Sequence, residues 1–361
     1  MTDSLEQAGL LDIYHKVTNG ERLSPEDGVR LYNTAHLPAL GYLANLVREQ
    51  KNGNKAYYIY NQHINYSNVC SNLCKFCAFG KEKQAPGSYE MSIEEIENKI
   101  KERLKEPISE VHIVGGIHPD LPYSYYTNML QAIKRIRPQI HIQAFTCVEI
   151  AHLAKLAGMS VEDTLKDLVR AGLGSIPGGG AEVFSTRIRE KLCPEKLPGK
   201  EWLEVAKTAH KLGIKSNATM LYGHIETVEE RIEHLVALRK AQDETGGFMC
   251  FIPLAFHPKN TGLEEVAPTG GIDDLKNIAV SRLMLDNFPH IKAYWVMLGP
   301  KVAQIALWYG ADDLDGTVLE EKITHMAGGE TAQAMTRSEI ERLIRAAGRE
   351  PVERDTLYNR I

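Results

Sequence analysis

The sequence lacks any long hydrophobic run. No stretch approaches the roughly 18 consecutive apolar residues that a membrane-spanning helix requires. Residues 1–11 contain acidic side chains where a signal peptide would be apolar. Both absences argue against membrane insertion and export, so we expect a cytoplasmic protein with no membrane partner.

An excess of positive charge is missing as well. The chain has 42 Lys and Arg against 47 Asp and Glu, a net charge of -5, and the two signs are mixed along its length. A nucleic-acid partner is not expected, because such partners are usually bound by a basic surface. The remaining composition, 43% hydrophobic and 25% charged, is that of an ordinary globular protein.

Cysteine is scarce, with six residues in a chain of 361. Three fall close together, at Cys70, Cys74 and Cys77. The isolated ones are Cys147, Cys193 and Cys250. A cytoplasmic chain of this length has no need of a disulfide framework, so the group of three indicates a metal site.

Short apolar runs alternate with amphipathic helices from residue 57 onward. We expect strands at 57–65, 110–115, 140–145, 173–177, 215–222, 248–254 and 291–297, with a short eighth near 315–319. We expect helices near 92–105, 123–136, 148–171, 199–212, 226–244, 272–287 and 300–308. This alternation predicts an α/β fold with a parallel sheet. The number of units fits a (β/α)8 barrel of the TIM type, complete or nearly so.

The chain divides into three segments. Residues 1–54 read as an N-terminal helical cap, because apolar residues recur at helical spacing and Ser24-Pro25-Glu26-Asp27 is a helix start. Residues 55–335 contain the barrel, and residues 336–361 look like a closing helix and a polar tail. No Pro- or Ser-rich linker separates the segments, so we expect one structural domain.

Barrel enzymes carry their chemistry on the loops that follow the strands. Unusual residues stand at these positions: the cysteines after the first strand, 115–118 after the second, 147–149 after the third, 177–182 after the fourth, 222–224 after the fifth and 256–258 after the sixth. We therefore expect these loops to form the active site.

The cysteine loop has the spacing C-x3-C-x2-C. Each iron of a [4Fe–4S] cluster normally takes one thiolate, so three cysteines leave the fourth iron open. That iron can chelate the methionine part of S-adenosylmethionine (SAM), and electron transfer from the cluster then yields methionine and a 5′-deoxyadenosyl radical. A structural zinc site usually has C-x2-C pairs with a fourth ligand at matching spacing. A ferredoxin-type cluster normally has a fourth cysteine nearby. The remaining cysteines are single and distant in sequence, so neither alternative fits the pattern as well.

The cysteine spacing, with Phe76 before the last cysteine, resembles the signature of the radical SAM superfamily. The resemblance implies that Gly115 and Gly116 hold the amino group of SAM, although a glycine pair after a strand can also be only a turn. Glu149 could accept hydrogen bonds from the ribose, or could be a first-turn acid that is favoured by the helix dipole.

Phe76 and Tyr222 could flank the adenine of SAM. Equally, Phe76 could be loop packing and Tyr222 a core residue.

Residues 61–70 are similar to the radical SAM enzymes of menaquinone and deazaflavin biosynthesis. Within that group, residues 115–122, 143–150, 217–227 and 251–258 resemble the aminofutalosine synthases, and residues 308–317 are shared more widely. The resemblance covers residues 55–335. Cys147 departs from it, because a smaller residue such as alanine is expected there.

The resemblance implies a transferase reaction. The 5′-deoxyadenosyl radical adds to the double bond of 3-[(1-carboxyvinyl)oxy]benzoate, and rearrangement with loss of the carboxylate carbon gives 6-amino-6-deoxyfutalosine for menaquinone biosynthesis. The electron would come from a donor such as flavodoxin or ferredoxin. The alternatives are a dehypoxanthine futalosine cyclase, a deazaflavin-forming enzyme and, more distantly, a non-catalytic metal-binding scaffold.

A substrate with two carboxylates needs cationic or hydrogen-donating partners. Arg187 follows the glycine-rich loop after the fourth strand, as does Lys191. His118, His224 and His257 each follow a strand and could bind a carboxylate or move a proton. A lone histidine is more often a structural hydrogen-bonding residue, and Arg187 could instead lie on a helix surface.

Two further motifs have weaker implications. The glycine loop 177–180 lacks the lysine and hydroxyl pattern of a phosphate-binding loop, so we expect it to make room for ligand, with Glu182 as a polar contact. Asp312, Asp313 and Asp315 could suggest calcium, but we favour a turn and cap.

Overall fold

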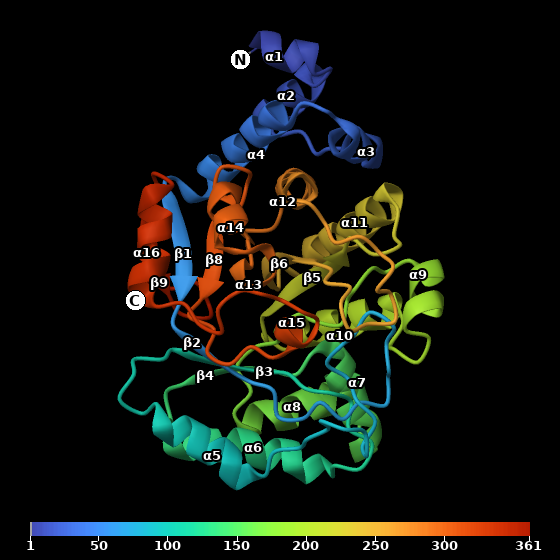
Figure 1. Ribbon diagram of the computed structural model, residues 1–361, viewed down its shortest axis with the longest axis vertical. Helices are drawn as coiled ribbons and strands as arrows, with labels where there is room; N and C mark the ends of the chain where they lie inside the picture. Colours follow the sequence, from blue (N-terminus) through green and yellow to red (C-terminus); the bar gives the residue numbers. More distant parts are fainter. Residues whose placement is uncertain (1) are drawn as a thin grey trace.

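A computed structural model describes residues 2–361 of the chain. Four N-terminal helices stand above a body in which parallel strands are surrounded by helices (Figure 1). The first helices are α1 (Thr2–Gln7), α2 (Leu11–Thr18), α3 (Pro25–Asn33) and α4 (Leu37–Asn52). The α/β class with parallel sheets is confirmed.

The strands form three parallel sheets. One has the order β8-β1-β9, from β1 (Lys55–Ile59), β8 (Asp313–Gly316) and β9 (Glu350–Arg354). The second has the order β2-β3-β4, from β2 (Asn61–Ile64), β3 (Glu110–Ile113) and β4 (His141–Ala144). The third has the order β5-β6-β7, from β5 (Ser216–Tyr222), β6 (Phe248–Ala255) and β7 (His290–Ile291).

Isolated parallel bridges connect these sheets. Gln143 bridges to Ser175, and Ile176 bridges to Ser216, so residues 175–176 lie between β4 and β5. Lys292 bridges to Asp313, and Gln62 bridges to Leu319. The carboxyl ends of the parallel strands therefore point to one side, where the loops meet.

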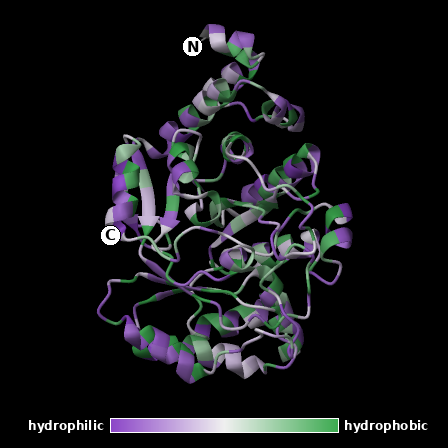
Figure 2. Cartoon of the chain, viewed as in Figure 1, coloured by the Kyte–Doolittle hydropathy of each residue, from purple (hydrophilic) through white to green (hydrophobic). Residues whose placement is uncertain are grey.

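The body helices are mostly amphipathic and cover the strands. They are α5 (Ile93–Glu102), α6 (Tyr123–Ile136), α7 (Cys147–Ala157), α8 (Val161–Ala171), α9 (Thr186–Leu192), α10 (Gly199–Lys211), α11 (Val228–Thr245), α12 (Gly271–Met284), α13 (Trp295–Leu298), α14 (Pro300–Ala306), α15 (Ile323–Met326) and α16 (Arg337–Ala346). Hydrophilic and hydrophobic residues alternate along the outer helices in Figure 2. In α5, for example, only Ile96 and Ile100 are buried.

Side-chain caps fix where several helices begin. Ser24 and Ser92 each form a capping box, with Asp27 and Glu95 as the respective partners. Both helix starts follow from the sequence pattern, because the side chain of the first residue accepts from the backbone amide three positions on.

The structure differs from the sequence-based expectations at several elements. Residues 173–177 form two bridges and no strand, and 291–297 is a two-residue strand followed by α13. The expected helix 148–171 is two helices, because Gly158 ends α7 in the left-handed conformation (φ 64°) and Ser160 caps α8. The polar tail contains β9, which pairs with β1.

The N-terminal helices pack on the body. Helix α4 contacts α12, and α3 contacts both α11 and α12. Gly28 allows this approach, because a Cβ there would lie 2.4 Å from Ile232 Cδ1 and 2.9 Å from Met284 Sδ. None of the helices in residues 2–361 has the length and apolar character needed to cross a membrane.

Candidate active site

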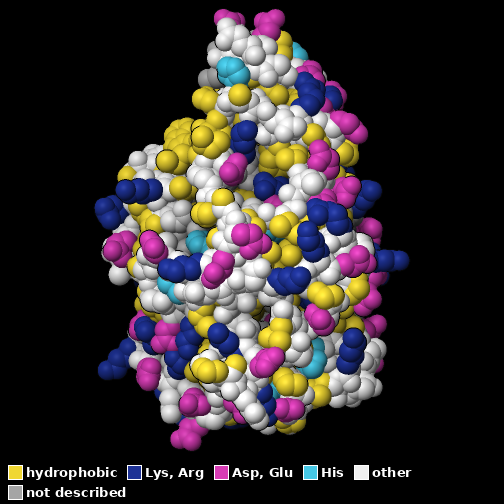
Figure 3. All heavy atoms as spheres, turned by 45° about the vertical axis from the view of Figure 1, so that its right-hand side comes forward, with side chains coloured by type: hydrophobic (Ala, Val, Ile, Leu, Met, Phe, Trp, Pro, Cys, Tyr) yellow, Lys and Arg dark blue, Asp and Glu magenta, His cyan; other side chains and the backbone are white. Residues whose placement is uncertain are grey.

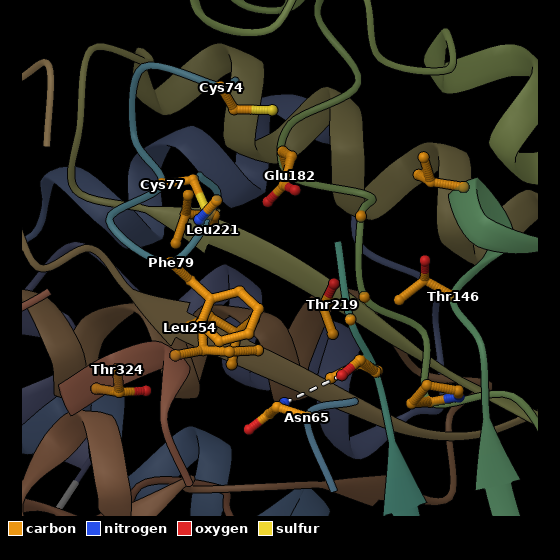
Figure 4. Close-up of a pocket in the computed structure, with 18 of the residues that line it drawn as sticks. Asn65, Cys74, Cys77, Phe79, Thr146, Glu182, Thr219, Leu221, Leu254 and Thr324 are labelled. Carbon is orange, nitrogen blue, oxygen red and sulfur yellow. Dashed lines mark hydrogen bonds between the residues drawn. The ribbon is translucent and has the colours of Figure 1, made fainter. Parts of the chain in front are cut away.

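A cavity opens where the loops after the strands meet. The cysteine loop lines it together with strand ends from β2 to β8 and with residues 321–327 near α15. In Figure 4, Cys74, Cys77 and Glu182 lie toward one end and Asn65 toward the other. We call the part around Cys70, Cys74 and Cys77 the cluster end.

The three predicted metal ligands share this cavity. Cys70, Cys74 and Cys77 all line it. Among residues 2–361, no group of three or more His, Cys, Asp or Glu side chains converges on a single ion position. A [4Fe–4S] cluster presents separate irons that each take one thiolate, so its ligands need not converge on one point.

Backbone amides point at two of the sulfurs. The amide of Ile117 lies 3.3 Å from Cys70 Sγ, and the amide of Gly80 lies 3.3 Å from Cys77 Sγ. Burial raises the pKa of both thiols. Amide donors favour the thiolate form, which is the form that binds iron.

Cys193 lies beside the cluster loop, which its position in the sequence did not suggest. The two thiols are close enough for Cys193 to raise the pKa of Cys74 and for Cys74 to lower that of Cys193. Cys193 is buried and is not among the cavity-lining residues. Cys193 therefore lies near one of the three loop cysteines without lining the cavity itself.

A buried ion pair also belongs to the cluster end. Lys196 Nζ lies 2.5 Å from Glu182 Oε1 and 5.3 Å from the centre of the Phe76 ring. All three residues line the cavity. The structure thus places Phe76 and Glu182 in the cavity, and it adds a lysine that the sequence motifs did not single out.

Gly115 and Gly116 are required by packing as well as by any ligand. A Cβ at Gly115 would lie 2.5 Å from the Tyr66 ring, and a Cβ at Gly116 would lie 2.1 Å from the backbone oxygen of Val69. The glycine pair therefore lets the end of β3 lie against the start of the cysteine loop. Both glycines also line the cavity.

Glu149 has a structural role and also lines the cavity. It completes the capping box of α7, in which its Oε2 accepts from the Thr146 amide at 2.7 Å. Its Oε1 accepts from the Tyr66 hydroxyl at 2.9 Å and from the Gly115 amide at 3.1 Å. Burial raises the pKa of Glu149 to about 6.

Tyr222 and Arg187 are not at the cavity, contrary to the sequence-based predictions. Tyr222 is fully buried and its hydroxyl donates to Asp274 at 2.7 Å, so the alternative of a core residue is correct. Arg187 is half exposed and pairs with Glu230 on α11 at 2.6 Å. Lys191, which lies nearby on α9, is exposed.

Two of the three predicted histidines have structural partners. His118 is buried; its Nδ1 accepts from the Asp120 amide, and its Nε2 lies 2.7 Å from Glu90 Oε2. His224 contacts the Leu221 carbonyl at 3.0 Å and Glu226 at 2.9 Å. Neither is among the cavity-lining residues, so a substrate role for these two histidines stays a prediction that the geometry does not favour.

His257 is the predicted histidine that reaches the cavity. It lines the wall and contacts the Met297 carbonyl through Nε2 at 3.0 Å. That contact holds the ring in place and leaves Nδ1 for another partner.

Strand residues supply a second polar region, which we call the inner end: His63, Lys292 and Asp315. His63 lies in β2 and Asp315 in β8, and Lys292 follows β7. All three line the cavity, and Lys292 pairs with Asp315. Sequence reasoning missed the histidine and the lysine because each falls inside an expected strand, whereas site residues were expected in the loops that follow strands.

The three aspartates near β8 each have a different cation. Asp312 pairs with Arg282, Asp313 with Arg354 at 2.6 Å, and Asp315 with Lys292. Asp312 also lies 2.6 Å from His290 Nδ1. All three aspartates are buried ion-pair partners. The Asp313 carboxylate also accepts from the Asp315 amide, so the expected turn is one part of their role.

Two family models match the chain. The radical SAM superfamily model matches residues 64–238. The model for the CofH/MqnC C-terminal region matches residues 245–361.

Several known proteins are similar over nearly the whole chain. An aminodeoxyfutalosine synthase of Thermus thermophilus is 48% identical over 358 residues, which cover 98% of this chain and 96% of the relative. The Streptomyces coelicolor protein of the same name is 42% identical, over 96% and 92% of the two chains. A 5-amino-6-(D-ribitylamino)uracil–L-tyrosine 4-hydroxyphenyl transferase of Archaeoglobus fulgidus is 44% identical, over 88% and 92%.

The fold is also found in solved structures. The crystal structure of methylornithine synthase matches with a TM-score of 0.72 at 20% identity, over 94% of this chain and 96% of that one. This likeness concerns the fold alone.

Proposed function

Because the chain belongs to the radical SAM superfamily, in the group that carries the CofH/MqnC C-terminal region, we infer that it transfers the 5′-deoxyadenosyl group of SAM to 3-[(1-carboxyvinyl)oxy]benzoate. The products are 6-amino-6-deoxyfutalosine and methionine, in the futalosine route to menaquinone. The observation that carries this inference is the 48% identity to the Thermus thermophilus synthase over 98% of the chain.

The residues present fit a [4Fe–4S] cluster. Cys70, Cys74 and Cys77 would hold three irons, and the amides of Ile117 and Gly80 would stabilise two of the thiolates. When bound, the cluster and SAM supply the 5′-deoxyadenosyl radical. The chain positions these groups and shields them in a cavity whose walls are largely apolar.

The SAM contacts that we propose lie at the cluster end. Gly115 and Gly116 leave backbone exposed beside the cysteine loop, where the amino group of SAM can approach. Phe76 offers a ring face for the adenine. Glu149 accepts three hydrogen bonds from the protein and has remaining lone pairs for the ribose.

The substrate is proposed to lie between the cluster end and the inner end. His257 is available there, because its Nδ1 has no partner among the described residues and its ring is held by the Met297 carbonyl. Residues 321–327 line the same cavity and help to exclude water.

Two further proposals concern the frame and the electron source. The three sheets are proposed to act as one complete eight-stranded barrel; the isolated bridges at residues 62, 143, 176 and 292 support this. The electron is proposed to come from a small donor such as flavodoxin or ferredoxin. Charges of both signs are interspersed on the face drawn in Figure 3, which offers no large basic surface for nucleic acid.

An anaerobic assay tests the function. The reconstituted enzyme is mixed with dithionite, SAM labelled in its adenosyl group and the enolpyruvyl benzoate, and the products are identified by mass spectrometry. We expect the label in a nucleoside adduct. Labelled 5′-deoxyadenosine as the sole product from this substrate would contradict the inference.

The similarity to the Archaeoglobus fulgidus transferase favours a second candidate, the deazaflavin-forming reaction. The same assay with L-tyrosine and 5-amino-6-(D-ribitylamino)uracil measures it directly. Activity with this pair and none with the enolpyruvyl benzoate would favour the transferase. A cyclase would instead consume dehypoxanthine futalosine and release free 5′-deoxyadenosine.

Cysteine variants test the ligand set. Cys77→Ser should lose cluster iron and all activity, whereas the matched control Cys250→Ser, at a buried cysteine that is not among the cavity-lining residues, should keep the iron. Cys193→Ala separates support from ligation. We expect the reconstituted variant to retain the iron content of the wild type; loss of iron would mean that Cys193 is itself a ligand.

A further inference from the structure

The cavity contains two residues with a permanent positive charge, at different places. Among the described residues that line it, these are Lys196 and Lys292. Lys196 pairs with Glu182 and lies over Phe76 at the cluster end. Lys292 pairs with Asp315 at the inner end. The two lysines therefore serve different parts of whatever occupies the cavity.

The environment of Lys292 is unusually closed for a lysine. Its side chain is 8% exposed, and its ammonium donates to Asp315 Oδ1. An ammonium has three N–H groups, and the described residues account for one of them. Buried donors are nearly always satisfied, so the site has donor capacity that a ligand can use.

His63 provides a second donor in the same cavity, close enough to Lys292 for the lysine charge to act on its ring. The residue is 7% exposed, lines the cavity, and its Nε2 has no hydrogen-bond partner among the described residues. Its ring stacks on His112 at a centroid distance of 4.5 Å. Burial, and next the neighbouring His112, lowers the pKa of His63 to about 3, so the imidazole is neutral and can donate through one nitrogen.

The chemistry of the proposed substrate decides which group reaches this place. This step rests on the proposed function. The enolpyruvyl carboxylate is attached to the double bond that the radical attacks, so it must lie near SAM at the cluster end. The ring carboxylate is meta to the ether oxygen, so it lies farther from SAM than the enolpyruvyl group does. Apolar side chains of β6, Ile252 and Leu254, line the cavity beside the inner end and can pack on the ring.

We propose that Lys292 and His63 bind the ring carboxylate of the substrate. Asp315 holds the ammonium in place by accepting one of its N–H groups, and the other N–H groups face the ligand. The buried Asp313–Arg354 pair lies close by and adds no net charge. The carboxylate thus gains two donors at a place where a ligand without it would leave both unsatisfied.

The test combines enzyme variants with ligand variants. Lys292→Met alone would leave Asp315 as a buried unpaired carboxylate, so the informative comparison is Asp315→Asn against the double variant with Lys292→Met and Asp315→Asn. Asparagine suits position 315, because its φ is 71° and asparagine tolerates that region. The ligands are the enolpyruvyl benzoate and 2-phenoxyacrylate, which lacks the ring carboxylate.

Binding is measured by calorimetry on the reconstituted enzyme with SAM and without reductant, so no turnover is needed. The wild type and Asp315→Asn should bind the benzoate about 10- to 100-fold more tightly than the analogue, as expected for a charged hydrogen bond. The double variant should lose most of this preference, and any remainder is the contribution of His63. Iron content and SAM cleavage without substrate show that each variant has folded and loaded its cluster.

Three results overturn the proposal: a wild type that binds both ligands equally, an Asp315→Asn variant that has lost the preference while it retains Lys292, or a double variant that keeps the full preference of the wild type. Failure of the proposed function is a different result. In that case the wild type forms no adduct from the benzoate in the turnover assay, whatever the binding experiment shows.

Discussion

The two ends of the cavity are built in different ways. At the cluster end, one continuous loop supplies Cys70, Cys74, Cys77 and Phe76. At the inner end, His63, Lys292 and Asp315 come from strands far apart in the chain. A ligand set on one loop leaves a spacing that can be recognised, whereas a site assembled by tertiary structure has no local pattern.

The two ends of the cavity are also stabilised by different interactions. The cluster end depends on close backbone approach, since Gly116 faces the Val69 carbonyl. The inner end depends on buried ion pairs that neutralise each other, Lys292 with Asp315 and Arg354 with Asp313. Each end should therefore be broken by a different kind of substitution.

The largest effect is expected from Gly116→Val. A Cβ at this position would lie 2.1 Å from the Val69 oxygen, which is backbone and cannot move without displacing the cysteine loop. We expect loss of cluster iron and of detectable adduct, measured by iron analysis and mass spectrometry. The control is Gly271→Ala, where a Cβ meets Val302 at 3.6 Å, an ordinary contact. Normal iron content in Gly116→Val would show that the loop is not positioned by this contact.

The second largest effect, on unfolding free energy, is expected at the buried Asp313–Arg354 pair near the inner end. Arg354→Met leaves Asp313 buried and without its cation, because the pair is 3% and 0% exposed. Removing one partner of such a pair costs about 3–5 kcal/mol of unfolding free energy. Urea unfolding of the variant measures this cost. Adding Asp313→Asn should recover most of it, and a single variant as stable as the wild type would mean that the pair is not closed in solution.

Glu149 is expected to have a smaller effect on the unfolding free energy, and this effect depends on pH. Burial raises its pKa from 4.5 to about 6 in the folded chain. Folding therefore favours the neutral form, and this contribution to stability is fully present below pH 4.5 and is lost as pH rises through 6. The shift corresponds to about 2 kcal/mol, at 1.36 kcal/mol per pKa unit.

Glu149→Gln removes this titration. Denaturant unfolding at several pH values should show the wild type losing stability relative to the variant between pH 4.5 and pH 7. Glutamine also places an NH2 group near the Thr146 amide, which now donates to Oε2 at 2.7 Å, so a pH-independent offset is expected too. A difference that stays constant with pH would contradict the raised pKa.

Much of the fold could be predicted from local pattern. The capping boxes at Ser24 and Ser92 and the strands β5 and β6 follow from residue type and spacing. The break at Gly158 was missed because helical periodicity continues on both sides of it. Strand β9 was missed because its residues are polar and its pairing with β1 joins two distant parts of the chain.

The candidate site shows the same difference between local motifs and tertiary contacts. Cys70, Cys74, Cys77, Gly115 and Gly116 were found because motif and strand end coincide, and the structure brings them to one cavity. His118 and His224 also follow strands, and Arg187 follows the bridges at residues 175–176, yet their side chains turn to Glu90, Glu226 and Glu230. Position after a strand fixes where the backbone is, but partners elsewhere decide where the side chain points.

The smallest effect is expected from Arg187→Met, which tests this last point outside both ends. Arg187 is 50% exposed, and its ion pair with Glu230 lies on the surface of α9 and α11. Exposed pairs contribute little to stability, because water screens them. We expect an unfolding free energy close to that of the wild type and kcat/KM within about twofold, since the side chain touches no part of the cavity. Lys196→Met is the matched comparison, because it removes a cation that does line the cavity. If Arg187→Met lowered kcat/KM more than tenfold while stability held, α9 would have to move toward the cavity during turnover, and the sequence-based assignment of Arg187 to the substrate would be restored.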